Sequence, residues 1–348
     1  MTSPITRQLP EAAIYARQLC QFCCKALAAW ILLASTIPVL GQGLIEPAPR
    51  QISELTPAIK IRVGKTADWV ATTTDAVWVG STGPYAVHRI DPETNRLVAS
   101  VHLPGNPCAG LATGFGSLWV PMCTKVPSLA RVDLIANQLT SVIPVGPAAR
   151  EAGIAVSSDS VWLVVDSAGS LTRIDPETGK VRQTVRVPGG SYNPLYSGGR
   201  IWVTRADGAE LTCVDAGTGA VLGTARTGPN PRFLSAGGGA IWTLNQGDGT
   251  LTRVDAQTIR ATSTIALGTP GHGGDISFAG GMIWTTMLQV PLSAVSSALN
   301  ALLCQWVGPG GDSLGIENDA IWLTDYASGT ISRIPLQDAL AHCYHPRL

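Results

Sequence analysis

The stretch Ala152–Gly190 reads AGIAVSSDSVWLVVDSAGSLTRIDPETGKVRQTVRVPGG, and the rest of the chain is interpreted from it. Short apolar runs that are typical of β-strands surround Trp162 and follow the turn at Asp175. In that turn the aspartate accepts bonds from the backbone ahead of it, the proline presets φ, and Gly179 takes a positive φ. The stretch therefore predicts four short antiparallel strands, of which the second contains Trp162.

The same pattern recurs along the chain with a period of about forty residues. One tryptophan marks each copy: Trp78, Trp119, Trp162, Trp202, Trp242, Trp284 and Trp322. In five copies an arginine precedes Ile or Val in the third strand: Arg89, Arg131, Arg173, Arg253 and Arg333. Four-stranded units repeated radially are propeller blades. We therefore predict an all-β, seven-bladed β-propeller, with each tryptophan wedged between blades and the arginines bonded to aspartates or carbonyls.

The ring needs a strand to close it, and two segments compete for that place. Residues 58–63 (AIKIRV) match the fourth strand of the repeat, VRQTVRV, and lie before the first blade. The C-terminal tail, which reaches Cys343 nine residues after Ile334, is the other candidate. We favour the N-terminal strand, which would complete the last blade.

The N-terminus has the composition of an export signal. Arg7, Arg17 and Lys25 precede the apolar run at residues 26–40, which ends in Val-Leu-Gly. The run is short for a membrane span, which needs roughly 20 apolar residues. We predict a signal peptide at residues 1–41, a linker at 42–54 and the propeller at 55–348, secreted or periplasmic. An uncleaved anchor is the alternative; after cleavage no membrane span is expected.

Charge and cysteine content narrow the function further. The formal net charge is zero and no basic run is present, which argues against nucleic acid as a partner. Five cysteines follow the apolar run. We expect a disulfide between Cys108 and Cys123 and a buried free thiol at Cys213. The tail cysteine, in HCYH at residues 342–345, either pairs with Cys304 or helps to bind a metal.

In a propeller the links between blades and the loops after the second strands share one face around the axis. Polar residues gather at both kinds of position, which favours a small polar ligand. The predicted ligand-binding residues are Asp68, Glu151, Asn193, Arg205, Arg232, Asn245, Asp275, Asp312 and Asp325. A merely solvated rim is the alternative interpretation.

The repeat at Ala152–Gly190 resembles those of YncE-like, YVTN-type propellers and, more distantly, the streptogramin (virginiamycin B) lyases. The resemblance covers about residues 58–334. In the lyases a catalytic histidine before a first strand works with two metal-binding glutamates. His272 stands at the matching histidine position, but Pro270 and Met287 replace the glutamates. Neither side chain supplies the oxygen ligand that a hard cation requires.

A third resemblance is limited to turns. The segments 175–179 and 215–219 are similar to the D-x-x-T-G turns of pyrroloquinoline-quinone dehydrogenases. The adjacent cysteines of many of those enzymes are absent after the signal, so we discount this interpretation.

Two functions remain. The first is an exported scaffold that binds a small polar ligand or a cell-envelope protein on its polar face. The second is a metal-assisted lyase or hydrolase in which His272 is the catalytic base and a divalent ion is the cofactor. We favour the scaffold, because no complete catalytic signature is present.

Overall fold

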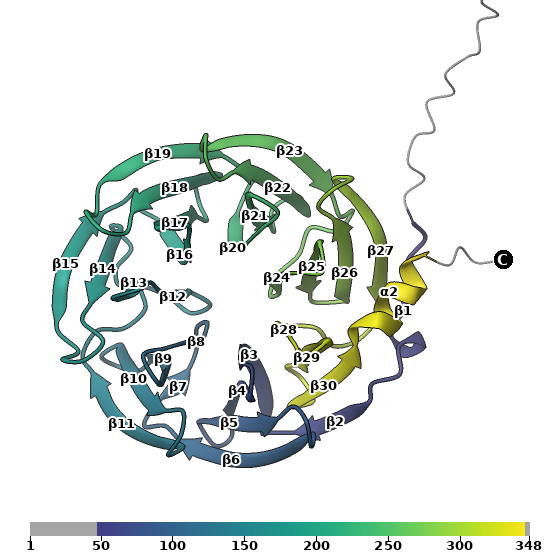
Figure 1. The fold of residues 1–348 in the computed structure, drawn as a ribbon, viewed down its shortest axis with the longest axis horizontal. Helices are drawn as coiled ribbons and strands as arrows, with labels where there is room; N and C mark the ends of the chain where they lie inside the picture. The colour runs from purple at the N-terminus through teal and green to yellow at the C-terminus, as the bar shows by residue number, and fades with distance from the viewer. Residues whose placement is uncertain (1–46, 345–348) are drawn as a thin grey trace, which may run out of the picture. The chain divides into compact units, whose positions relative to one another are not determined.

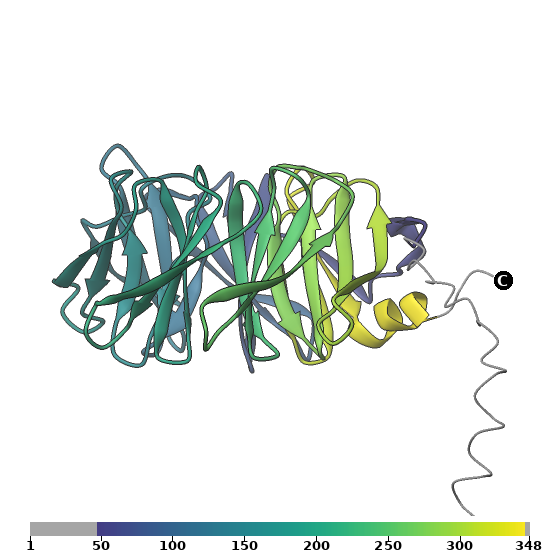
Figure 2. The same cartoon turned by 90° about the horizontal axis from the view of Figure 1, so that it is seen from above.

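Residues 47–344 are described by the computed structural model, and they form a ring of seven β-sheets (Figure 1). Every sheet contains at least four strands, the first next to the axis and the last on the outside. The predicted all-β, seven-bladed propeller is therefore confirmed. Figure 2 shows the blades from the side, with their strands running between the two faces of the ring.

The first four blades follow one another along the chain. Blade one consists of β3 (Thr66–Thr73), β4 (Ala76–Thr82), β5 (Ala86–Asp91) and β6 (Arg96–His102). Blade two consists of β7 (Asn106–Pro107) and β8 (Ala112–Gly114), which both pair with β9 (Ser117–Cys123), then β10 (Ser128–Asp133) and β11 (Gln138–Ile143). Blade three consists of β12 (Ile154–Val156), β13 (Val161–Val164), β14 (Ser170–Ile174) and β15 (Val181–Arg186). Blade four consists of β16 (Ser191–Ser197), β17 (Arg200–Arg205), β18 (Glu210–Asp215) and β19 (Val221–Arg226).

The last three blades complete the ring. Blade five consists of β20 (Pro231–Gly237), β21 (Ala240–Asn245), β22 (Thr250–Asp255) and β23 (Arg260–Ala266). Blade six consists of β24 (Asp275–Ala279), β25 (Met282–Met287), β26 (Val290–Ser296) and β27 (Ala301–Val307), with β1 (Arg50–Gln51) parallel to β27. Blade seven consists of β28 (Leu314–Glu317), β29 (Ala320–Asp325), β30 (Thr330–Pro335) and β2 (Ile59–Arg62).

The N-terminal strand closes the ring, as predicted. Strand β2 pairs antiparallel with β30, with Ile61 opposite Ile331. The last part of the expected linker is also structured, because β1 and the 3-10 helix η2 (Ile52–Glu54) precede β2. The tail instead forms helix α2 (Leu336–Tyr344), and the Cys304–Cys343 disulfide joins it to β27. The predicted signal peptide lies outside the described residues.

The repeat tryptophans form the core between blades. All seven are at most 1% exposed. Trp162 of blade three packs in one cluster with Ile201 and Val203 of blade four, and the other blade contacts follow the same scheme. The predicted wedge position is confirmed. Within the described chain, no helix is both long enough and apolar enough for a membrane span.

Among the repeat arginines, Arg89 and Arg173 form the predicted bonds to aspartates, and three arginines make a contact that was not predicted. Arg173 pairs with Asp159 in its own blade and donates to the Gly217 carbonyl of the next blade at 2.9 Å. Its guanidinium carbon also lies 5.4 Å from the centre of the Trp162 ring, directly across the strand pair. Arg131 and Arg253 stack in the same way on their own tryptophans. These three arginines therefore cover the outer side of their tryptophans, and Arg173 also joins two neighbouring blades.

Candidate functional site

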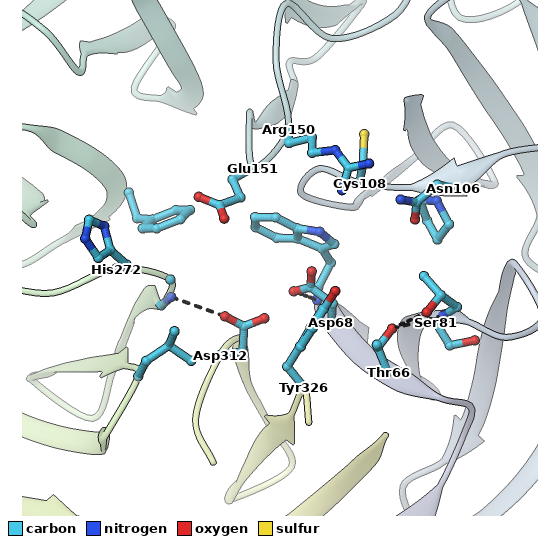
Figure 3. Close-up of a pocket in the computed structure, with 17 residues that line it drawn as sticks. Thr66, Asp68, Ser81, Asn106, Cys108, Arg150, Glu151, His272, Asp312 and Tyr326 are labelled. Carbon is cyan, nitrogen blue, oxygen red and sulfur yellow. Dashed lines mark hydrogen bonds between the residues drawn. The ribbon is translucent and has the colours of Figure 1, made fainter. Parts of the chain in front are cut away.

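A cavity of about 300 Å³ opens at the axis, on the face where the blade links and the second-strand loops meet (Figure 3). We call it the upper cavity. Its polar lining includes Asp68, Glu151, His272 and Asp312, which come from four different blades or links. Arg150 and Tyr326 also line it. Four of the ten predicted site residues therefore converge on one volume.

The floor of the upper cavity is aromatic and was not predicted. Trp69 follows Asp68 at a bulge in β3 and has a φ of 52°, in the left-handed region that non-glycine residues rarely adopt. Its ring centre lies 6.1 Å from that of Phe233, across the axis in blade five. Both rings also line a second cavity of about 170 Å³ further along the axis. The two rings thus separate an upper and a lower cavity.

Two half-buried carboxyl groups, those of Asp68 and Asp312, line the upper cavity. The Asp68 carboxylate also accepts from the Trp69 backbone N–H at 2.7 Å. Burial, and then the neighbouring Asp312, raises the pKa of Asp68 well above its ordinary value. Burial likewise raises the pKa of Asp312. The pair therefore retains one proton more readily than two separate exposed aspartates would.

Glu151 is held at the opposite side of the cavity by an ion pair. Its Oε2 lies 2.6 Å from Nη1 of Arg232, and its backbone φ of 60° is left-handed. The Arg232 guanidinium lies 4.7 Å from the centre of the Tyr192 ring, whose hydroxyl donates to the Arg150 carbonyl. The side-chain amide of Asn193 donates to the Arg232 carbonyl at 2.7 Å. Arg232 and Asn193 therefore position Glu151 and its link.

Asp275 and Asn193 line the lower cavity. One oxygen of Asp275 accepts from the Ser313 hydroxyl at 2.6 Å and the other from the Ile276 N–H at 2.8 Å. Burial nevertheless raises the pKa of Asp275 to about 6. The Asn193 Oδ1 is buried and has no hydrogen-bond partner among the described residues. The lower cavity thus contains one readily protonated acid and one unused acceptor.

Four predicted ligand-binding residues do not line either cavity: Arg232, which pairs with Glu151, and Asn245, Arg205 and Asp325. Asn245 is 0% exposed and donates to the hydroxyls of Thr250 and Thr252 within its own blade. Arg205 forms an ion pair with Asp207 at 3.0 Å. Asp325 accepts from the Ser328 N–H, and its neighbour Tyr326 reaches the cavity instead. In these three blades the position three residues after the tryptophan points into the blade or onto the loop, whereas Ser81 at the same position of blade one lines the upper cavity.

The cysteines pair as the spacing suggested. Cys108 and Cys123 form a disulfide with a Cα–Cα distance of 5.6 Å, which fixes the loop between β9 and β10 beside the upper cavity. Cys213 is a buried free thiol. The tail cysteine pairs with Cys304 and so is not available as a metal thiolate. His345 of the HCYH motif lies outside the described residues.

Comparison with known proteins places the chain in a family. The family model described as outer membrane protein assembly factor BamB matches residues 86–281. The chain belongs to this family. No curated protein matches the sequence. Among solved structures, BamB from Moraxella catarrhalis matches with a TM-score of 0.58 over 80% of this chain and 99% of that chain. The identity is 13%, so this second likeness concerns the fold alone.

In this BamB-family chain the lyase residues are not arranged around a metal. Met287 is buried, and the ring of His272 is exposed at the rim of the upper cavity. Across residues 47–344, no group of three or more His, Cys, Asp and Glu side chains is placed to hold a metal ion. No described side chain orients the His272 ring through a hydrogen bond. A bound divalent ion and a base role for His272 therefore remain predictions.

A buried histidine next to the upper cavity also has serine partners. His88 Nε2 lies 2.7 Å from Ser81 Oγ, which lines the cavity, and Nδ1 lies 2.8 Å from Ser100 Oγ. Burial, and then His102, lowers the pKa of His88 to about 4. In blade five, Asn245 and Thr252 form the corresponding polar bond between the second and third strands. The repeat of this bond in another blade favours a structural role for His88.

The buried acids make a specific prediction for the pH dependence of stability. A carboxyl group whose pKa is higher in the folded than in the unfolded protein stabilises the fold at low pH. This stability is fully present below the pKa of the unfolded protein, and it is lost as the pH rises through the pKa of the folded protein. For Asp275 this window runs from 3.8 to about 6. In wild-type protein the free energy of unfolding should fall by at most about 1.4 kcal/mol per pH unit across that window because of Asp275, and Asp275→Asn should remove this slope. Urea unfolding of both proteins between about pH 4 and about pH 7 measures this difference; parallel curves would contradict it.

Proposed function

We propose that this BamB-family propeller is an exported scaffold of the cell envelope that binds a partner protein on its link face. The link face is the surface around the upper cavity. The observation that carries the proposal is that cavity, with carboxylates from several blades above an aromatic floor. Exposed Leu288 and Tyr326 line its edge and offer apolar contact area. A concave, partly apolar site with a few convergent polar groups is typical of binding sites.

The family and the cysteines support the cellular location. The matching family model is described as an outer membrane protein assembly factor, which is an envelope role. Two disulfides suit an oxidising compartment such as the periplasm. The apolar run at residues 26–40 supports export. Mass analysis of the native chain should find an N-terminus near Gln42; a chain that keeps residues 1–41 would be anchored or retained instead.

The cavity favours a partner side chain over a large free ligand. Its volume of about 300 Å³ lies at the lower end of the range of ligand pockets. A small polar ligand and a YncE-like role are compatible with the same face. No observation on residues 47–344 favours the alternative, a metal-assisted lyase or hydrolase using His272, over the scaffold.

Copurification from native envelopes tests the proposal. The double variant Leu288→Glu/Tyr326→Glu places charge on the link face and should reduce recovery of the partner at least about tenfold, because like charge and desolvation oppose docking. The matched control Ile135→Glu/Leu299→Glu changes two exposed apolar residues in turns of the opposite face. Equal recovery with both variants would contradict binding on the link face.

A further inference from the structure

The two aspartates of the upper cavity have no cationic partner within the protein. No ion pair among residues 47–344 reaches Asp68 or Asp312. Arg232, on the other side of the cavity, is paired with Glu151 at 2.6 Å. Arg150 lines the cavity but its side chain is exposed. Within the described chain, neither aspartate is therefore neutralised by an ion pair.

The floor supplies a second, independent feature. Trp69 is 5% exposed, and its ring lines the cavity together with Phe233. An aromatic surface beside carboxylates attracts a cation through the ring quadrupole.

We propose that the upper cavity binds the ammonium or guanidinium group of a lysine or arginine side chain from the partner protein. This inference rests on the proposed function. The cation binds the carboxylates of Asp68 and Asp312, and its alkyl stem contacts Trp69 and Phe233. Charge-assisted hydrogen bonds to two carboxylates are stronger than neutral ones. Glu151 adds a third carboxylate to the lining and is paired with Arg232 at 2.6 Å.

Binding of a cation to these carboxylates should depend on pH. The groups that face the pair are Glu151, Arg150 and His272 from the links, together with Arg232 behind Glu151. Burial raises the pKa of both aspartates, so affinity for a cation should rise with pH as they ionise, by up to about tenfold per unit. A neutral ligand would show no such increase.

The test uses blocked tripeptides, acetyl-Gly-Lys-Gly-amide and the same peptide with an acetylated lysine side chain, in calorimetric titrations of the full mature protein. We expect the lysine peptide to bind, the acetylated peptide to bind at least about tenfold more weakly, and affinity to increase from about pH 5 to about pH 7.5. Asp312→Asn and Asp68→Asn should each lower the affinity for the lysine peptide at least about tenfold. Asp207→Asn, outside the cavity in a loop of the same face, should leave it unchanged.

Each other outcome counts against the inference. Equal binding of the two peptides, or binding that both cavity variants leave intact, would overturn the cation site. Butylammonium chloride is a free small amine. If it bound at least about tenfold more tightly than the lysine peptide, the occupant would be a small amine and not a protein side chain. Melting curves of both variants show whether they fold. If the peptides fail but copurification still depends on Leu288 and Tyr326, the cavity chemistry is wrong while partner binding stands.

Discussion

Replacing Trp202 by alanine should lower the free energy of unfolding by about 3–5 kcal/mol. Trp202 is 1% exposed and packs with Leu211 of its own blade and with Ile241 and Val254 of blade five. Truncation removes apolar contacts to two blades at once. It also leaves a cavity that cannot close unless a blade of the propeller moves. Urea unfolding measured by circular dichroism gives the difference.

An exposed apolar residue of the same blade is the control for this prediction. Leu222 in β19 is 44% exposed, so Leu222→Ala should change the free energy of unfolding by less than about 0.5 kcal/mol. An unchanged melting temperature for Trp202→Ala would mean that the repeat tryptophan is not the residue that joins the blades.

Removal of the Cys304–Cys343 disulfide has the second large expected effect. The bridge closes a loop with a sequence separation of 39, for which the loss of chain entropy in the unfolded state corresponds to about 4 kcal/mol. It also holds α2 against blades six and seven, where Ala339 is fully buried. Cys304→Ser/Cys343→Ser should therefore unfold at a clearly lower urea concentration than the wild type.

The other disulfide provides the comparison. Cys108–Cys123 has a separation of 15, which corresponds to about 3 kcal/mol. In dithiothreitol both disulfides of the wild-type protein are reduced. The wild type should then lose at least as much free energy of unfolding as a double variant that lacks either one of the two disulfides. If Cys304→Ser/Cys343→Ser unfolded like the oxidised wild type, α2 would be held by packing alone.

The blades were predictable because each carries its own signal. One tryptophan, one turn and alternating strands repeat about every forty residues, and residues 58–63 carry the fourth-strand pattern that the last blade lacks. Helix α2 was missed, because it follows the last repeat and has no counterpart elsewhere in the ring.

The site was predictable only in part. Asp68, Glu151, His272 and Asp312 were found because links converge at the axis, but which of them share one cavity depends on contacts between residues far apart in sequence. Trp69 was missed because its place at the axis depends on a bulge and a left-handed backbone, which no repeat pattern encodes. Asn245 was assigned to the site because its position in the repeat was taken to face the axis, whereas its amide completes a buried bond network.

The most direct test of partner binding is site-specific photocrosslinking in native cells. A benzophenone side chain at Tyr326, 45% exposed beside the upper cavity, should yield one defined protein adduct. The same group at Ile135, 91% exposed on the opposite face, should yield none. An adduct from Tyr326 alone, reduced at least about tenfold by Asp312→Asn, is the result that we predict. Equal adducts from both positions, or an adduct from Ile135 alone, would contradict a partner-binding link face.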